Sequence, residues 1–500
     1  MLFRPDTSDL SAIALNLCRV LLVVAAVMLI PAVVGVVLGE HNEALAFLIA
    51  ACLAAIVGLV GELTLPRDIS IDWQHGMIVA AIAWVVAPLF GAMPLHLSGH
   101  YGSFFDAYFD AMSGFATAGL AVINDLDHLA ESVNLWRHLM QFLGGQGLML
   151  MALSLFAGGG GSVGMYVGEG REDRIVPNIH RTARIIWRVA LVYGLIGILL
   201  LFVSLTAAGV SVSQAGFHAV NLFMAAFDTG GFAPNSAGIW LYHAWSVELV
   251  IGVLMIAGAL SFALHYHLWQ RRVLEPWRNI ETRLLALTLF GSFAVACVGL
   301  VRSEAYASLD ALLRRGLFQV VSAHTGTGFS NIPGRLFVTE WGVLAPAAVV
   351  LAMGLGGMAG STAGGIKAIR VGLIGKAVTE QMRRLTLPRS AVTLQTYHSG
   401  TRQVLNDAVM RSALTILLLY LVMYLAGAAV GLFYGYTFDQ AMFESTSASA
   451  AVGLSVGIVG PTMPDGLQLT YIVQMWLGRL EFVAVLALLG FIVSAYRGRV

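Results

Sequence analysis

Phe318-Gln-Val-Val-Ser-Ala-His-Thr-Gly-Thr-Gly-Phe329 is one of four copies of a twelve-residue pattern in this chain. It is too short and too polar to cross a bilayer, and the small residues of its second half form helix poorly. Three other stretches match it. They are Phe109-Asp-Ala-Met-Ser-Gly-Phe-Ala-Thr-Ala-Gly-Leu120, Asn221-Leu-Phe-Met-Ala-Ala-Phe-Asp-Thr-Gly-Gly-Phe232 and Phe443-Glu-Ser-Thr-Ser-Ala-Ser-Ala-Ala-Val-Gly-Leu454.

The four stretches align without gaps. The eleventh position is always glycine, as Gly119, Gly231, Gly328 and Gly453, and the twelfth is always Leu or Phe. These glycines are 112, 97 and 125 positions apart, and each copy has its own apolar flanks. Internal repeats of this size are typical of membrane transporters.

We interpret each stretch as a short helix that enters the membrane, ends, and continues as a strand whose carbonyl groups face a common axis. Glycine permits the backbone angles that such a strand needs. Four strands would replace the hydration shell of an ion with carbonyl oxygens, and four helix C-termini would favour a cation. The alternative is close packing of transmembrane helices on small residues, which explains one such run but not four matched copies.

Composition agrees with a polytopic membrane protein. Of 500 residues, 58% are hydrophobic and 11% are charged, and the mean hydropathy is +0.81. The partner of most of the surface is therefore the lipid bilayer. The net charge is zero, so no nucleic-acid partner is expected.

The predicted fold is all-α. Two N-terminal transmembrane helices precede four helix–pore-loop–helix repeats, arranged pseudo-fourfold around one ion pore. About ten crossings are expected, and the second helices of repeats one, two and four are expected to be continuous near 135–156, 246–269 and 469–495. The predicted domains are 1–70 (two N-terminal helices), 71–170 (pore repeat 1), 171–275 (pore repeat 2), 276–400 (pore repeat 3 with an intramembrane gating loop) and 401–500 (pore repeat 4).

Lysine and arginine gather in the segments between repeats and at the C-terminus, which predicts that this side, with both termini, is cytoplasmic. The filters would then open outward, although Arg302, Arg314, Arg315 and Arg335 lie in the third outer segment. The basic residues assigned to the cytoplasmic side between the repeats and at the C-terminus are Arg171, Arg174, Arg181, Arg184, Arg188, Arg271, Arg272, Arg278, Arg283, Lys376, Arg383, Arg384, Arg389, Arg402, Arg411, Arg497 and Arg499.

Acidic residues gather in the outer segments. They are expected either to concentrate cations at the pore mouth or to form a solvated loop surface. They are Asp106, Asp110, Asp125, Asp127, Glu131, Asp439, Glu444 and Asp465.

A glycine-rich run, Met353–Lys367, lies halfway along the second helix of repeat three and should break that helix. Non-helical backbone at membrane depth is tolerated only inside protein or beside a water-filled cavity. Below the filter, such a run would be a flexible constriction, and hence a gate; the alternative is a glycine-rich packing seam. The candidate gate residues in this run are Gly354, Gly356, Gly357, Gly360, Gly364, Gly365 and Lys367.

Arg479 and Glu481 lie inside the last apolar span. A buried arginine at a helix centre costs about 2.5–3.5 kcal/mol on insertion scales, so Arg479 needs a water-filled cavity or a partner. We predict that it opposes cations in the lower pore and acts with Met353–Lys367 as a gate. The alternative is a structural ion pair with Glu481 or another helix.

Two residues near the predicted filters stand out. Asp228 aligns with Ala116, Thr325 and Ala450, and His324 aligns with two phenylalanines and a serine. Asp228 could raise the negative field along the ion path, and His324 could titrate near neutral pH. Either side chain could instead form hydrogen bonds that support the filter from behind.

Three further motifs complete a resemblance to a known family. They are Gly360-Ser-Thr-Ala-Gly-Gly-Ile-Lys367, Gly478-Arg-Leu-Glu481, and Trp136-Arg137 followed by Gln141-Phe-Leu-Gly-Gly-Gln-Gly147. With four filters that end in Gly-Leu or Gly-Phe, the sequence resembles the Trk/Ktr/HKT superfamily of cation transporters over nearly its whole length. The two leading helices resemble the Trk-type membrane subunit rather than the shorter Ktr type.

The resemblance implies potassium uptake across the plasma (inner) membrane of a bacterium, with K⁺ as the transported ion and no cofactor in this chain. It also implies a homodimer on a cytosolic, TrkA-like ring of nucleotide-binding regulatory subunits. Gly119 is the family's potassium-favouring choice, whereas Asp228 and His324 depart from the usual filter pattern. The filter would be lined by Thr117, Ala118, Gly119, Thr229, Gly230, Gly231, Gly326, Thr327, Gly328, Ala451, Val452 and Gly453.

Other functions remain as alternatives. The nearest is the same fold carrying sodium or mixed cations, with or without coupling to protons as a symporter. A secondary transporter for a small solute, moving by rocking of repeats, would place its site between broken helices. An intramembrane enzyme is not expected, because the sequence offers no metal-binding or nucleophile motif at membrane depth.

Overall fold

The computed structural model describes residues 6–67, 72–123, 125–155, 161–169, 179–388 and 395–497. The predicted domain boundaries at 70/71 and 170/171 lie outside these residues, as do Arg171, Arg174, Arg389 and Arg499.

The described residues form helices and one two-stranded antiparallel hairpin. The first part of the chain contains α1 (Thr7–Leu38), α2 (His41–Thr64), α3 (Trp73–Leu97), α4 (Phe104–Phe115), α5 (Glu131–Gln146), α6 (Leu148–Leu155), α7 (Gly161–Gly168), α8 (Ile179–Ala207), α9 (Val212–Phe227), the 3₁₀-helix η1 (Gly238–Tyr242), α10 (Trp245–Ala259) and α11 (Phe262–Trp269). The second part contains α12 (Glu275–Arg278), α13 (Ile280–Arg302), α14 (Leu309–His324), α15 (Leu336–Thr339), α16 (Leu344–Gly354), α17 (Ala368–Thr386), β1 (Thr396–Ser399), β2 (Thr401–Val404), α18 (Asp407–Phe433), α19 (Phe438–Ser449), α20 (Asp465–Arg479) and α21 (Val483–Arg497).

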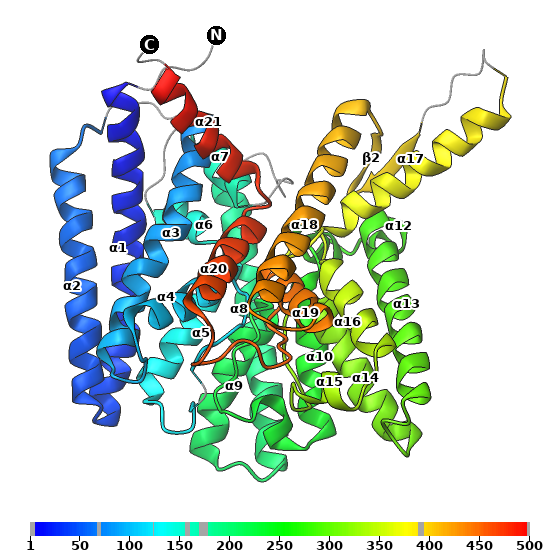
Figure 1. Ribbon diagram of the computed structural model, residues 1–500. Helices are drawn as coiled ribbons and strands as arrows, with labels where there is room; N and C mark the ends of the chain where they lie inside the picture. The colour runs from blue at the N-terminus through cyan, green and yellow to red at the C-terminus, as the bar shows by residue number, and fades with distance from the viewer. Residues whose placement is uncertain are drawn as a thin grey trace.

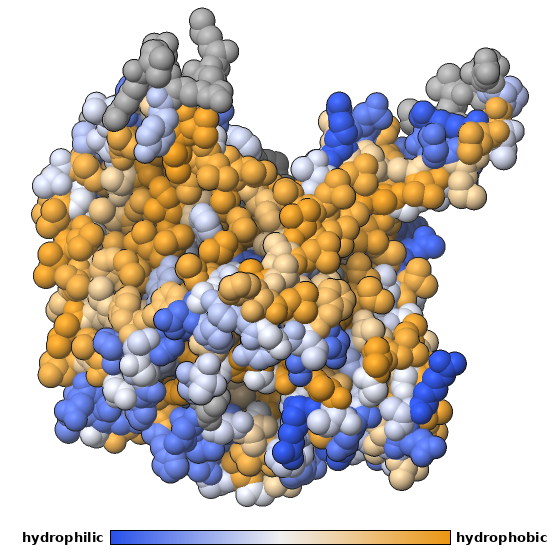
Figure 2. Space-filling model, in the orientation of Figure 1, coloured by the Kyte–Doolittle hydropathy of each residue, from blue (hydrophilic) through white to orange (hydrophobic). Residues whose placement is uncertain are grey.

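The helices form a bundle that suits a bilayer. Six of the described helices, α1, α2, α3, α8, α13 and α18, are long and apolar enough to cross a membrane. Figure 2 shows apolar side chains over the flanks of the bundle, with polar side chains at its lower end and at the upper ends of α17 and α18. The start of α1 and the end of α21 lie at the same end of the molecule (Figure 1).

The α1–α2 hairpin lies at one side of the molecule and packs on α3 (Figure 1). The four short helices predicted to enter the membrane are present as α4, α9, α14 and α19. Each packs against the long apolar helix that precedes it, namely α3, α8, α13 and α18 in turn. The arrangement of two leading helices and four repeated units is therefore confirmed.

The second helices of the repeats are not continuous, and the prediction of unbroken helices at 135–156, 246–269 and 469–495 was wrong. Gly147, with a φ of 99°, separates α5 from α6. The axes of α10 and α11 differ by 100°, and those of α20 and α21 by 105°. The break predicted in repeat three is confirmed, because α16 ends at Gly354 and α17 begins at Ala368.

These breaks bear on the number of crossings. Counting each bent pair as one span raises the number of candidate spans among the described residues from six to eight. The other two of the ten expected crossings correspond to α5–α6 and α16–α17, in which short helices meet at an interruption. The interruptions place non-helical backbone inside the bundle, where protein can satisfy its polar groups.

Candidate functional site

The predicted filter strands share one backbone conformation. In every copy the first and third residues have a positive φ, and the residue between them does not. In three of the four copies the first of these residues is not a glycine. A residue with a side chain pays about 1–3 kcal/mol to adopt a positive φ. The φ values are 54° at Thr117, 74° at Gly119, 50° at Thr229, 75° at Gly231, 70° at Gly326, 85° at Gly328, 52° at Ala451 and 101° at Gly453.

One backbone hydrogen bond ends each short helix in the same way. The amide of the middle filter residue donates to a carbonyl one turn back in its own helix, at 2.8–3.0 Å, which ties the strand to the helix end. The pairs are Ala118 N to Ser113 O, Gly230 N to Ala225 O, Thr327 N to Ser322 O and Val452 N to Ser447 O. Local sequence therefore produces the same turn four times.

The four strands meet in a closed ring. Each eleventh-position glycine lies against the middle-residue carbonyl of the next repeat, so close that a side chain has no room. A Cβ atom would lie 2.5 Å from Gly230 O at Gly119, 2.0 Å from Thr327 O at Gly231, 1.9 Å from Val452 O at Gly328 and 2.6 Å from Ala118 O at Gly453. The contacts run from repeat one through two, three and four and back to one, so all twelve predicted filter residues lie in or beside one ring.

The side chain of Gln141 in α5 binds the filter strand of repeat two. Its amide nitrogen donates to Gly230 O, and its Oε1 accepts from the amide of Phe232 at 3.3 Å. Gln141 was not among the predicted site residues, although it opens a motif that carried the family resemblance. It fixes the second strand from the neighbouring repeat.

Two acidic residues expected at the outer mouth have a different role. Asp110 and Glu444 are fully buried, so their assignment to the mouth was wrong. Both occupy the second position of their stretches and accept from a backbone amide three residues beyond the filter glycine. The bonds are 2.8 Å from Val122 N to Asp110 Oδ1 and 2.9 Å from Val456 N to Glu444 Oε1.

Asp228 and His324 contact neighbouring helices. Asp228 caps α9, is fully buried, and accepts from Gln146 Nε2 of repeat one at 2.6 Å. His324 Nε2 lies 2.7 Å from Thr288 Oγ1 on α13. These contacts fit the support role, and an effect of either residue on the ion path stays a prediction.

The loop between α16 and α17 lies directly against the filter, because a Cβ atom at Gly364 would lie 2.1 Å from Ala450 O. Its ends pair with each other, since Gly356 N donates to Ile366 O at 2.9 Å and Ile366 N donates to Gly354 O at 3.2 Å. At its tip, Thr362 Oγ1 donates to Phe227 O, the last carbonyl of α9, and lies 3.1 Å from Thr229 Oγ1.

The break between α10 and α11 holds this loop. Met358 N donates to Ala259 O at 3.0 Å, and Phe262 N donates to Gly360 O at 3.2 Å. Among the predicted gate glycines, Gly360 and Gly365 have φ values of 68° and 70°, which favour glycine. The run is thus an ordered intramembrane loop, whose gating role stays a prediction.

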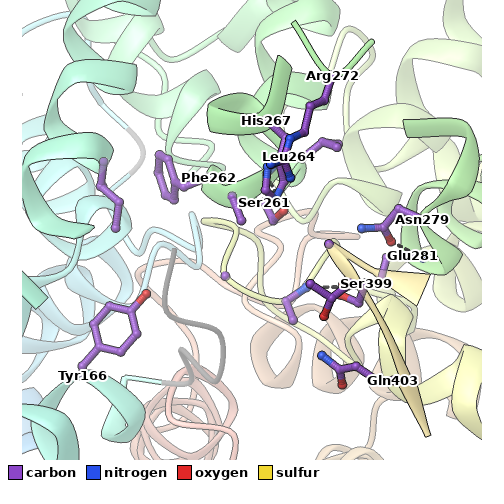
Figure 3. Close-up of a pocket in the computed structure, with 16 residues that line it drawn as sticks. Tyr166, Ser261, Phe262, Leu264, His267, Arg272, Asn279, Glu281, Ser399 and Gln403 are labelled. Atoms are coloured by element: carbon purple, nitrogen blue, oxygen red, sulfur yellow. Dashed lines mark hydrogen bonds between the residues drawn. The ribbon is translucent and has the colours of Figure 1, made fainter. Parts of the chain in front are cut away.

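A cavity of about 240 Å³ adjoins the loop on the side of the hairpin (Figure 3). Ala359 and Gly360 form its wall toward the loop, and its other walls come from α7, α8, α11, α13, the segments beside α12 and the β1–β2 hairpin. Glu281 bridges two of these parts, because its carboxylate accepts from Ala359 N at 2.7 Å and from Ser399 Oγ at 3.4 Å. The loop therefore lies between the filter and a cavity lined by both polar and apolar side chains.

Arg479, at the end of α20, joins three repeats beside the filter. Its guanidinium donates to Thr362 O of the loop at 2.9 Å, to Gly144 O of α5 at 2.5 Å and to Thr117 Oγ1 of the first filter at 3.3 Å. Arg479 therefore lies beside the loop, as predicted from the sequence. A cationic group therefore lies between the first filter strand and the loop.

Glu481 does not pair with Arg479. Its carboxylate binds the guanidinium of Arg370 and lies 3.8 Å from Lys367 Nζ, and all three side chains are buried. Lys367, a predicted gate residue, also donates to Ala363 O. This cluster fastens the start of α17 to the break between α20 and α21.

Glu481→Gln is expected to lower the melting temperature in detergent by at least about 5 °C. Removing one partner of a buried ion pair costs about 3–5 kcal/mol, and each kcal/mol shifts the midpoint by a few degrees. Glu380→Gln is the control, because Glu380 pairs with the exposed Arg384, and such pairs contribute less than about 1 kcal/mol. Equal shifts for the two variants would contradict the role of the cluster.

One set of residues escaped the prediction. Gly144, Gly258 and Gly478 lie in the second helices at spacings close to those of the filter glycines. Each of these glycines lies against the backbone carbonyl of the last residue of the short helix in its own repeat. A Cβ atom would lie 1.9 Å from Phe115 O, 2.1 Å from Phe227 O and 1.9 Å from Ser449 O, in turn. The sequence does contain a signal for them, because a glycine lies 25–27 positions after each filter glycine.

Gly258→Ala is expected to abolish most of the folded yield. The added methyl group would overlap a backbone carbonyl that cannot move without displacing the filter. Gly252→Ala in the same helix is the control, since nothing lies within 4 Å of its Cβ position, and alanine there stabilises helix by up to about 1 kcal/mol. Size-exclusion profiles of the two variants measure the yield. A monodisperse Gly258→Ala protein at parental yield would show that the contact is not needed.

Comparison with known proteins agrees with this geometry. The family described as "TrkH: Cation transport protein" matches residues 44–493. A protein of Methanocaldococcus jannaschii named an uncharacterized cation transporter is 31% identical, over 97% of this chain and 96% of its own. The Trk system potassium uptake protein TrkH of Halomonas elongata is 28% identical, over 83% and 85%.

A solved structure shares the fold. The crystal structure of the potassium transporter TrkH from Vibrio parahaemolyticus superposes with a TM-score of 0.80 at 23% identity, covering 95% of this chain and 98% of the other. The four-repeat ring, the multi-span helical architecture and the match over most of the sequence point the same way. The chain belongs to the TrkH family of cation transport proteins, which are membrane transporters and not enzymes.

Proposed function

We propose that this protein takes up potassium through the ring of filter strands. The observation that carries the proposal is the closed set of four glycine–carbonyl contacts at Gly119, Gly231, Gly328 and Gly453. A ring of backbone carbonyls can replace the hydration shell of a monovalent cation. A potassium uptake protein among the relatives supports the choice of ion.

The loop and Arg479 act in this proposal as the gate. The loop tip lies against Phe227 O and Thr229 at the base of the filter, and the guanidinium of Arg479 holds the loop through Thr362 O. Opening requires the loop to withdraw toward the adjoining cavity. The positive charge of Arg479 raises the barrier for a cation until then.

The assembly we propose is a homodimer in the plasma (inner) membrane of a bacterium, on a cytosolic ring of nucleotide-binding, TrkA-like subunits. Both termini and the β1–β2 hairpin face the cytoplasm, which follows from the lysine and arginine bias. The common end shared by α1 and α21 supports the assignment of both termini to one side of the membrane (Figure 1).

Cation flux into liposomes tests the function. The parent protein is expected to carry K⁺ and Rb⁺ at least about tenfold faster than Na⁺, and not choline. Gly119→Ser is expected to lose this preference, because a side chain at Gly119 meets Gly230 O and reshapes the ring. Equal K⁺ and Na⁺ flux in the parent would replace the proposal with a sodium or mixed-cation transporter.

A further inference from the structure

A cationic pocket, distinct from the ion path, lies at the upper end of α13. It has a volume of about 860 Å³, and its walls come from α12, α13, α17 and the β1–β2 hairpin. Four of its side chains are Arg278, Arg283, Lys376 and Arg402, and no acidic side chain lines it. Figure 1 shows the elements converging where α17 leaves the body of the molecule.

None of the four cationic side chains forms an ion pair with a carboxylate within the described part of the chain, and the carboxylate of Glu275 pairs with His398 instead. The guanidinium groups of Arg278 and Arg283 have no hydrogen-bond or ion-pair partner among the described residues. Lys376 Nζ donates to Thr396 O at 2.8 Å, and Arg402 Nε donates to Thr396 Oγ1 at 3.0 Å, so both are held at the pocket by the hairpin. Four like charges in one pocket repel one another unless an anion joins them.

The neighbouring surface belongs to the membrane boundary. Trp277, beside Arg278, is 77% exposed, and exposed tryptophans mark the headgroup level of a bilayer. Further along α13, Leu287 lines the pocket and is 69% exposed, and Phe290 is 65% exposed. The pocket therefore opens at headgroup depth, with an apolar wall that continues into the hydrocarbon.

We propose that this pocket binds the phosphate headgroup of an anionic phospholipid from the cytoplasmic leaflet. The guanidinium and ammonium groups bind the phosphate, and an acyl chain lies along Leu284 and Leu287. The cytoplasmic side rests on the orientation proposed above. A free phosphate would use the same cations but not the apolar wall.

The ligand would join elements that lead to the loop. α17 begins directly after Lys367, and it packs on α13 at Gly372, where a Cβ atom would lie 3.1 Å from the side chain of Ile280. A phosphate between Arg283 on α13 and Lys376 on α17 bridges the same two helices. Lipid in the pocket therefore holds α17 against α13.

Native mass spectrometry with phosphatidylglycerol and phosphatidylcholine tests the proposal without measuring transport. The parent protein is expected to retain phosphatidylglycerol at least about tenfold better than phosphatidylcholine. The triple variant Arg278→Gln/Arg283→Gln/Arg402→Gln is expected to lose at least about tenfold of that retention. The control Arg383→Gln/Arg384→Gln/Arg411→Gln removes the same charge from exposed positions outside the pocket and should retain the lipid.

Leu287→Trp separates the sources of phosphate and leaves every charge in place. It is expected to reduce phosphatidylglycerol retention several-fold by obstructing the apolar wall, and its exposed site spares the fold. Retention that is equal in the two triple variants overturns the proposal. Displacement of the lipid by inorganic phosphate at equal concentration also overturns it, in favour of a soluble anion. The lipid-binding measurements do not depend on transport. A protein that fails to transport potassium would contradict the proposed function but not the lipid site.

Discussion

Gly328→Ala is expected to reduce potassium uptake by more than about tenfold. The new methyl group would lie 1.9 Å from Val452 O of the next repeat, and overpacking of this kind costs about 1–3 kcal/mol. The φ of 85° adds a further penalty of about 1–2 kcal/mol for a residue with a side chain. A distortion that raises the conduction barrier by about 1.4 kcal/mol already gives a tenfold loss.

Two control variants separate the causes of that loss. Gly457→Ala places a side chain at a φ of 103° with nothing within 4 Å, so it tests backbone strain alone outside the ring. Gly291→Ala, also with open space around it, tests neither strain nor contact. Rubidium uptake in liposomes measures all three. Parental uptake by Gly328→Ala would refute the ring of close contacts as the conduction site.

Arg479→Gln is expected to raise potassium flux by about tenfold or more. A unit charge about 10 Å from an ion, at an effective dielectric constant of 20, contributes about 1.7 kcal/mol to the barrier. The substitution also weakens the hydrogen bonds that hold the loop at Thr362 O and α5 at Gly144 O. Both changes favour conduction.

Arg479→Lys distinguishes charge from anchoring. Lysine keeps the positive charge but cannot reproduce the planar set of donors that reaches Thr117, Gly144 and Thr362 together. A flux near the parental value for Arg479→Lys and a raised flux for Arg479→Gln would assign the barrier to charge. A fall in flux for Arg479→Gln, in protein that remains folded, would contradict the gating role.

The local parts of the site could be predicted from sequence. The turn after each short helix depends on a few adjacent residues, above all the glycine with positive φ, so four similar stretches produced four similar turns. The glycine-rich run at Met353–Lys367 was likewise identified as a break, because consecutive glycines disfavour helix. Family membership, and with it cation transport, followed from the same motifs.

Features that depend on distant partners were missed. The breaks at Leu260 and at Glu481 occur in spans that are apolar overall, although the second contains Arg479 and Glu481. Contacts from other repeats stabilise these breaks, such as the bond from Arg370 to Glu481 across 111 positions. Asp110 and Glu444 looked like mouth residues because the backbone amides that donate to their carboxylates lie 12 positions away, on the returning strand. The role of Gln141 depends on a strand 89 positions later.

Anomalous diffraction from crystals soaked in Tl⁺, a heavy monovalent stand-in for K⁺, shows whether the four strands bind a monovalent cation. We expect a peak on the axis of the ring formed by Gly119, Gly231, Gly328 and Gly453, weakened by competing K⁺ but not by Na⁺. A ring without a peak, in crystals that bind Tl⁺ elsewhere in the protein, would contradict the proposal that these strands form the potassium filter.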